Sequence, residues 1–268
     1  MAECSEGRRV VAIVPAHERQ DTVGETVRAL LDTGRVDSVL VVDDGSADAT
    51  SRAAAAAGAR VLRLVENRGK GGAVAAGLDA LGADQGHDDG DAADDADGTE
   101  PGAWSGCDVV ALIDADTGAS ASEVTRLLSP VLDGTADMAV AVLPPAGGRG
   151  GFGLVRDLAA AGIFEAVGRD FAAPLSGQRA MPLSLARSLT PAPRFGLEVG
   201  LTIDAVRRGA RVVEVPTAFD HRHTGRSLGG FLHRMRQGRD LVLALLPRIG
   251  PGGTARALWR TIGDRLHR

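Results

Sequence analysis

The sequence predicts an α/β fold in which a mainly parallel sheet is flanked by helices. Two observations lead to this prediction. Short runs rich in valine, isoleucine and leucine alternate with helical segments through the first half of the chain, and several of these runs end on polar, glycine-containing turns. With 268 residues and a hydrophobic content of 44%, the chain is large enough for one α/β domain with a sizeable core.

The first half alternates clearly between the two kinds of element. Apolar runs predict strands, and apolar residues spaced three or four apart predict helices, as with Val23, Val27 and Leu30. An alanine-rich helix is closed by Gly58, since glycine often follows the last helical residue. In chain order, we expect strand 9–14, helix 22–31, strand 38–42, helix 47–57, strand 60–65, helix 69–81, strand 108–113, helix 122–132 and strand 138–143. This order favours right-handed crossovers between parallel strands.

The second half is less regular, and its periodic segments are separated by longer irregular stretches. We expect a helix at 152–167, a loop containing Gly177 at 171–182, a helix at 197–208, a strand at 211–215 and an amphipathic helix at 228–246. The chain is therefore predicted to form a single domain over residues 8–246 with a C-terminal helical extension. Residues 247–268 are predicted to be a basic tail.

Residues 84–103 are predicted to be an acidic insertion. The segment from Asp84 to Glu100 holds eight acidic residues and no basic one, and without it the formal charge changes from −5 to +3. Its low apolar content and many glycines predict disorder. Its acids lack the ligand spacing of a calcium-binding loop, so we interpret it as a surface loop.

Composition argues against several classes of protein. The chain shows no secretory signal and no apolar run near the roughly 20 residues that cross a membrane. Its two cysteines make no disulfide framework. Aromatic residues are only 3% and tyrosine is absent, which limits stacking on bases. We therefore expect a cytoplasmic protein that does not bind nucleic acid.

Four polar motifs follow the first four predicted strands. If the sheet is parallel, all four lie at its carboxyl edge, where open α/β sheets bind their ligands, and they outline one cleft. The motifs are VPAHE at 14–18, VDDGS at 42–46, NRGKGG at 67–72 and DAD at 114–116.

The first three motifs suit a nucleoside diphosphate. Asp43 or Asp44 can accept hydrogen bonds from a base or ribose, while Gly45 and Ser46 allow a close approach of the backbone. Lys70 is the only lysine among 30 basic residues, and it stands in a glycine-rich turn that opens a helix. Such a turn offers backbone N–H groups and a cation to an anionic ligand.

Asp114 and Asp116 follow a strand of buried type, where an unpaired carboxylate is costly. Two hard oxygen ligands at this place suit Mg²⁺ or Mn²⁺ bound together with a substrate phosphate. The alternative is a polar loop in which Asp116 caps the next helix. A Walker A loop and a Rossmann dinucleotide site do not fit, because Lys70 is followed by glycine and the first strand by Pro-Ala-His-Glu.

As an ordered set, the stretches IVPAHER, VVDDGSADAT, NRGKGGAVAAGL and ALIDAD resemble the N-terminal half of family 2-type glycosyltransferases of the GT-A fold. In the second half, PLSGQRA, FGLEVG and HRH resemble the branch with glucosyl-3-phosphoglycerate synthases and dolichyl-phosphate-mannose-synthase-like enzymes. The resemblance covers about residues 8–246. It implies transfer of a hexose from a UDP- or GDP-linked sugar to an anionic acceptor.

The resemblance also implies catalytic and metal-binding roles. Lys70 would face the diphosphate, and Glu198 would lie near the donor sugar as the candidate base of an inverting reaction. Asp116 would bind Mg²⁺ or Mn²⁺, and Asp114 would contact either ribose or the metal. The further metal ligand would be His221 or His223, but not both, because residues one apart in an extended segment face opposite sides.

The other positions carried over from the resemblance belong to two binding sites. The nucleotide-sugar site would comprise Pro15, Ala16, His17, Glu18, Asp43, Asp44 and Ser46, and the acceptor site Gly177, Gln178 and Arg179.

The identity of the acceptor stays open. His17 replaces the asparagine that is usual in the first motif, and PLSGQ replaces the common PLAGE of the phosphoglycerate branch. The arginine-rich stretch 207–268 suits a small acid such as 3-phosphoglycerate. It also suits a polyprenyl phosphate at a membrane surface, reached by the basic helix at 228–246. Three further questions stay open. They are whether the protein forms a homodimer, whether the transfer retains or inverts the configuration of the sugar, and whether the protein is instead a non-catalytic binder of nucleotide sugars.

Overall fold

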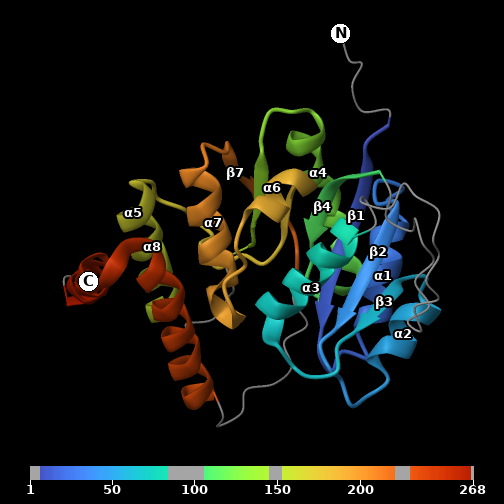
Figure 1. Cartoon of the computed structure of the whole chain (residues 1–268), viewed down its shortest axis with the longest axis horizontal. Helices are drawn as coiled ribbons and strands as arrows, with labels where there is room; N and C mark the ends of the chain where they lie inside the picture. The colour runs from blue at the N-terminus through green and yellow to red at the C-terminus, as the bar shows by residue number, and fades with distance from the viewer. Residues whose placement is uncertain (1–6, 84–105, 145–152, 221–229, 267–268) are drawn as a thin grey trace.

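The protein is built around one seven-stranded sheet with the strand order β3-β2-β1-β4-β6-β5-β7 (Figure 1). The computed structural model describes residues 7–83, 106–144, 153–220 and 230–266, so the acidic insertion lies outside the described residues. The strands are β1 (Arg9–Ala16), β2 (Ser38–Asp43), β3 (Arg60–Arg63), β4 (Cys107–Leu112), β5 (Met138–Val142), β6 (Arg179–Pro182) and β7 (Val212–Pro216). All neighbouring strands are parallel except β6, which runs antiparallel to both β4 and β5.

Helices cover both faces of the sheet (Figure 1). The described α-helices are α1 (Val23–Leu31), α2 (Thr50–Ala56), α3 (Gly69–Ala83), α4 (Val124–Leu132), α5 (Gly153–Val167), α6 (Leu183–Ser188), α7 (Leu197–Arg207) and α8 (Gly230–Leu266). Two short 3₁₀ turns, η1 (Gly118–Glu123) and η2 (Arg194–Gly196), lead into α4 and α7.

Strict alternation along the central strands separates the core into two layers. In β1, Val10, Ala12 and Val14 pack against α1, α2 and α4, whereas Val11 and Ile13 pack on the opposite face with α3, α5 and α7. Successive side chains of a strand point to opposite faces, so a strand covered on both sides needs an unbroken apolar run. The parallel half of the sheet therefore has the sequence pattern from which it was predicted.

The stretch 171–182, predicted as a loop, contains strand β6 in its last four residues. Arg179 pairs with Leu112 on one side and with Val140 on the other, so β6 lies in the middle of the sheet. Only four residues form the strand, with an arginine at one end and a proline at the other, and neither suggests a buried strand. The prediction of a loop there is wrong, and the short helix α6 that follows was not predicted.

The C-terminal helical extension is present and is longer than the sequence pattern indicates. Helix α8 runs from Gly230 to Leu266, with a kink at Gly250, whose φ of 69° and ψ of 174° are not helical. Its residues Leu241, Leu245 and Ala257 are buried in the core layer shared with α5 and α7. Residues 247–266, described from the sequence as a basic tail, are therefore helical and partly packed.

The length of α8 does not make it a membrane span. Within the residues that the structure describes, no helix combines the length and the apolar character needed to cross a bilayer.

Candidate active site

Hydrogen bonds join the turns that follow β1, β2 and β3. The N–H of Asp44 donates to the Ala16 carbonyl at 2.8 Å, and the N–H of Glu18 donates to Ser46 Oγ at 2.9 Å. The two carboxylate oxygens of Asp44 accept the N–H groups of Arg68 and Gly69, both at 2.7 Å. The predicted convergence of these motifs at one edge of the sheet is confirmed.

Asp43 and Asp44 hold these turns in place. Both are almost completely buried, at 1% and 3% exposure. The Asp43 carboxylate accepts hydrogen bonds from the Ser46 N–H at 2.9 Å and from the Ser51 hydroxyl. In this geometry the carboxylates brace the backbone. Contact of either one with a base or ribose stays a prediction.

The four positions from Pro15 to Glu18, at the end of β1 and just after it, have different surroundings. Ala16 is buried and pairs with Asp43, Pro15 is half-buried, and His17 and Glu18 are exposed. Glu18 has a φ of 52°, which is uncommon for a residue other than glycine. The exposed positions at the strand end are open to a ligand, and their predicted contact with the nucleotide remains untested.

Lys70 forms the centre of a charged cluster at the same edge. Its Nζ lies 2.5 Å from Asp114 Oδ1 and 2.9 Å from Glu198 Oε1. Burial alone would lower the pKa of Lys70, but the two carboxylates outweigh this effect and hold the pKa above its ordinary value. The cluster is therefore a fixed ammonium group between two carboxylates, with one net negative charge.

Three elements distant in the sequence supply the cluster. Lys70 is the second residue of α3, Asp114 follows β4, and Glu198 is the second residue of α7. The structure thus brings together three residues that the sequence analysis named as functional.

Gly177 and Gln178 support Asp114. A Cβ on Gly177 would lie 2.7 Å from Asp114 Oδ2 and even closer to Lys70 Nζ, so only glycine leaves room for the cluster. Gln178 is fully buried at 0% exposure, and its Nε2 donates to Asp114 Oδ2 at 2.8 Å. The Gln178 side chain is thus buried against Asp114, and its predicted contact with the acceptor stays a prediction.

Arg179 departs from the acceptor prediction. It is 1% exposed, its Nε donates to the Ser176 carbonyl at 3.0 Å, and its Nη1 donates to Thr202 Oγ1 at 2.8 Å. Its Nη2 has no hydrogen-bond partner among the described residues. Burial lowers the pKa of Arg179 to about 10, and only partial compensation comes from Glu198 and Glu214. Arg179 is a core residue below α7 and does not reach the surface of the cleft.

The metal-binding prediction is only partly within the described residues. Both Asp114 oxygens contact protein donors, Lys70 and Gln178. Asp116 stands two residues further on, and a carboxylate is a ligand type that suits Mg²⁺ or Mn²⁺, so its metal-binding role stays a prediction. Within the described part of the chain, no group of three or more His, Cys, Asp and Glu residues is arranged to hold a metal ion. His221 and His223 lie outside the described residues.

The segment from Thr190 to Arg194 was not singled out in the sequence. The Ala192 carbonyl lies so close to Gly71 that a Cβ on Gly71 would overlap it, and the Arg194 side chain packs over Gly69. In the sequence, the two glycines beside Lys70 could have indicated that another segment packs closely against this turn, since glycine often marks a close approach of two backbones.

Comparison with known proteins agrees with this geometry. Residues 11–84 match the family described as glycosyl transferase family 2. The glucosyl-3-phosphoglycerate synthase of Mycolicibacterium paratuberculosis is 27% identical over 96% of this chain and 78% of its own length. The undecaprenyl-phosphate mannosyltransferase of Micrococcus luteus is 28% identical over 82% of this chain and 86% of its own.

Solved structures of similar proteins share the fold. The Mycobacterium tuberculosis glucosyl-3-phosphoglycerate synthase in complex with Mn²⁺, UDP and phosphoglyceric acid superposes with a TM-score of 0.68 and 26% identity, covering 91% of this chain and 79% of that one. The same enzyme with Mg²⁺ and UDP gives a TM-score of 0.68, 26% identity, and 91% and 80% coverage. The protein is therefore a glycosyltransferase of the GT-A fold, and its residues 11–84 match glycosyl transferase family 2.

Proposed function

We propose that this enzyme transfers a hexose from a UDP-linked sugar to a small phosphorylated acid such as 3-phosphoglycerate. The observation that carries the proposal is Lys70, held between Asp114 and Glu198 where the strand ends converge. Similar structures that contain UDP, Mn²⁺ and phosphoglyceric acid support the same choice of donor and acceptor. A non-catalytic sugar-nucleotide binder is less favoured, because the similar proteins of known activity are glycosyl-transferring enzymes.

Lys70 has the charge that the leaving group requires. Cleavage of the sugar–phosphate bond leaves negative charge on the diphosphate, and a fixed cation stabilises that charge without reorganising during the reaction. Asp114 and Glu198 orient the ammonium group in the resting site. We therefore assign Lys70 to the diphosphate and Asp114 to the ribose side, with Gln178 holding Asp114 in place.

Asp116 would hold a divalent cation together with diphosphate oxygens. His221 or His223 remains the candidate for a further ligand. Mg²⁺ or Mn²⁺ bound there would neutralise charge on the departing diphosphate.

Glu198 is assigned to the sugar side of the cluster. Its carboxylate points at Lys70 from the start of α7, so a donor whose diphosphate meets Lys70 would bring its sugar near Glu198. In an inverting reaction, Glu198 would take the proton of the acceptor hydroxyl as that oxygen attacks the anomeric carbon.

A polyprenyl phosphate is the second candidate acceptor. The similarity to the undecaprenyl-phosphate mannosyltransferase is of the same strength as that to the phosphoglycerate enzymes and covers a larger share of the relative. This candidate predicts transfer only in the presence of lipid.

One transfer assay tests both acceptors. Purified enzyme would receive UDP-glucose, GDP-glucose or GDP-mannose with 3-phosphoglycerate, glycerate or undecaprenyl phosphate in vesicles, each with Mn²⁺, Mg²⁺ or EDTA. We expect a metal-dependent product from UDP-glucose and 3-phosphoglycerate, none from glycerate, and a transfer rate lowered by at least about 100-fold in Asp116→Ala and Glu198→Gln.

The matched control is Glu165→Gln, because Glu165 lies on α5 and pairs with Arg256, outside the Lys70 cluster. It should keep wild-type turnover. Product from undecaprenyl phosphate alone would replace the proposed acceptor with the lipid, and no product from any pair would refute both candidates.

A further inference from the structure

Two glycines flank Glu198 because helix α8 packs against both. A Cβ on Gly196 would overlap the Ala244 side chain of α8, and a Cβ on Gly200 would lie 3.0 Å from Arg248 Nη2. The glycine spacing around Glu198 therefore reflects a close contact between the start of α7 and the C-terminal helix. This contact connects the far end of the chain to the active-site cluster.

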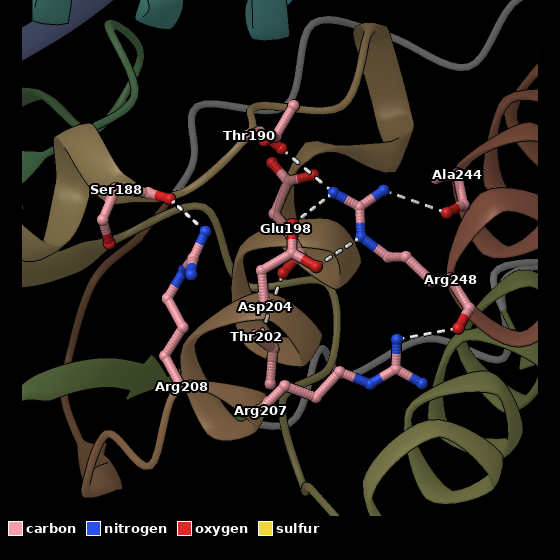
Figure 2. Close-up of polar contacts among 9 residues, drawn as sticks. All are labelled: Ser188, Thr190, Glu198, Thr202, Asp204, Arg207, Arg208, Ala244 and Arg248. Carbon is pink, nitrogen blue, oxygen red and sulfur yellow. Dashed lines mark hydrogen bonds and ion pairs between the residues drawn. The ribbon is translucent and has the colours of Figure 1, made fainter.

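Arg248 is the main polar element of this contact (Figure 2). Its Nε and Nη2 lie 2.9 and 2.5 Å from the two carboxylate oxygens of Asp204 on α7. Its Nη1 donates to the Ala244 carbonyl at 3.0 Å, and its Nη2 also donates to the Thr190 carbonyl at 3.0 Å. The side chain is only 10% exposed, so this bidentate pair is shielded from water and fixes three segments together.

The third segment leads directly to Lys70. Thr190, whose carbonyl accepts from Arg248, lies two residues before Ala192. The Ala192 carbonyl packs against the backbone of Gly71, next to Lys70, at a separation that leaves no room for a Cβ. A shift of the Thr190–Ala192 segment would therefore move the turn that carries Lys70.

We propose that Arg248 is a positioning residue that aligns Lys70 and Glu198 through the two segments it holds, α7 and Thr190–Ala192. The side chain of Arg248 bonds to Asp204, Ala244 and Thr190, and it acts by fixing the helix that carries Glu198 and the segment behind Lys70. Lysine cannot replace it, because one ammonium group cannot pair with both Asp204 oxygens and reach Thr190 in the same geometry. Through Arg248, helix α8 therefore helps to position the residues of the active site.

The first test does not depend on turnover. Lys70 is the only lysine in the chain, so an amine-reactive acetylating reagent reports on it directly, with the N-terminal amine as internal reference. Arg248→Met should raise the acetylation rate of Lys70 several-fold at fixed pH, because the ammonium group loses its fixed place between Asp114 and Glu198. Arg248→Lys should give an intermediate rate.

Arg256→Met is the matched control. Arg256 is also an α8 arginine paired with one carboxylate, Glu165, but that pair faces α5. In the Arg256→Met variant, the acetylation rate of Lys70 should equal that of the wild type. An unchanged Lys70 rate in Arg248→Met, in protein whose far-ultraviolet circular dichroism is native, would overturn the proposal.

The second test uses transfer kinetics and rests on the proposed function. A small displacement of catalytic groups can cost about 100-fold, so Arg248→Met should lower kcat by about 10- to 100-fold, with the KM for the UDP-sugar changed by less than about twofold. In a Glu198→Gln background, the same substitution should lower kcat by a smaller factor than in the wild type, because the part of the loss that acts through Glu198 is already gone and coupled residues are not additive.

The two tests separate the ways in which the proposal can fail. Equal losses of kcat from Arg248→Met in both backgrounds would mean that Arg248 acts independently of Glu198, and the positioning role would be wrong. A wild-type enzyme without transfer activity would refute the proposed function, and Lys70 acetylation would still decide the role of Arg248.

Discussion

Lys70 shows how one residue can be chemically defined by its surroundings. Its ammonium group is paired with Asp114 and Glu198, and these carboxylates raise its pKa despite the opposing effect of burial. The pairing restrains a long, flexible side chain in one position. A lysine held in this way can meet an incoming diphosphate without first paying the entropy of ordering its side chain.

The raised pKa of Lys70 predicts a loss of stability at alkaline pH. A cation whose pKa is higher in the folded than in the unfolded chain stabilises the fold fully below the unfolded pKa, which is 10.5 for lysine. That contribution falls as the pH rises above 10.5 toward the folded pKa. Urea unfolding at pH 9 and pH 11 should therefore show a larger loss of stability for the wild type than for Lys70→Met. An equal loss of stability in the wild type and in Lys70→Met would contradict the pairing of Lys70 with Asp114 and Glu198.

Gly177→Ala should inactivate the enzyme through a single methyl group. The new Cβ would overlap the Lys70 ammonium and Asp114, neither of which can move without breaking the ion pair. Overpacking of this kind costs about 1–3 kcal/mol of folding stability, and misplacing the cation should lower the transfer rate by at least about tenfold.

Gly263→Ala is the control, since a Cβ on Gly263 would have no neighbour within 4 Å. It should keep full activity in the same assay. Full activity of Gly177→Ala would show that the cluster tolerates displacement.

At the residue scale, the sequence identified the members of the site better than their individual roles. Lys70 was recognisable in its glycine-rich turn and Asp114 at the end of an apolar strand, whereas Glu198 was named from the family resemblance and from Gly196 and Gly200 on either side. The burial of Gln178 and Arg179 was not predicted, because position in the PLSGQR motif does not say which way each side chain points. Only the register of β6 against β4 and β5 settles that question.

At the scale of helices and strands, the prediction was right where the spacing of apolar residues along the chain was regular. Strands covered on both faces, such as β1, β2 and β4, were predicted well because their residues must be almost uniformly apolar. Strand β6 was missed because four residues containing Arg179 and Pro182 carry no such pattern. Helix α8 was cut short because Pro247 and Gly250 normally end a helix, whereas here the chain kinks and continues.

Strand β6 carries an element-scale prediction, because it holds a charged residue within the core. Arg179 is fully buried, its Nη2 has no partner in the described structure, and its pKa is lowered to about 10. A cation whose pKa is lowered by folding destabilises the fold at every pH below about 10. Arg179→Met, which keeps most of the volume, should therefore stabilise the protein at pH 7 by about 1–3 kcal/mol in urea unfolding.

The control for Arg179→Met is Arg211→Met. Arg211 makes a bidentate, exposed pair with Asp137, the residue immediately before β5, so its loss should be neutral or slightly destabilising. Destabilisation of Arg179→Met beyond that of Arg211→Met would mean that the hydrogen bonds to Ser176 and Thr202 outweigh the cost of burying the charge.

At the scale of the whole molecule, the two halves of the chain share one sheet and one site. The parallel half supplies Lys70 and Asp114, and the second half supplies Glu198, the antiparallel β6 and the helix that packs behind them. The parallel half was predictable from local patterns, since each βαβ unit repeats the same signals. The second half depends on contacts between segments far apart in the chain, such as Arg248 with Asp204, which no local pattern reveals.

The acidic insertion gives the last prediction. It falls between the end of α3 at Ala83 and the start of β4 at Cys107, and both elements are anchored in the core by residues such as Leu81 and Val109. Replacing residues 85–104 with a short Gly-Ser linker removes seven acids and no base, so the formal charge changes from −5 to +2. Loop length affects stability only weakly, because each doubling costs about 0.6 kcal/mol. The shortened protein should therefore keep its calorimetric melting temperature within about 2 °C and its transfer rate within about twofold. A large fall in either quantity would show that the insertion takes part in the fold or in the site.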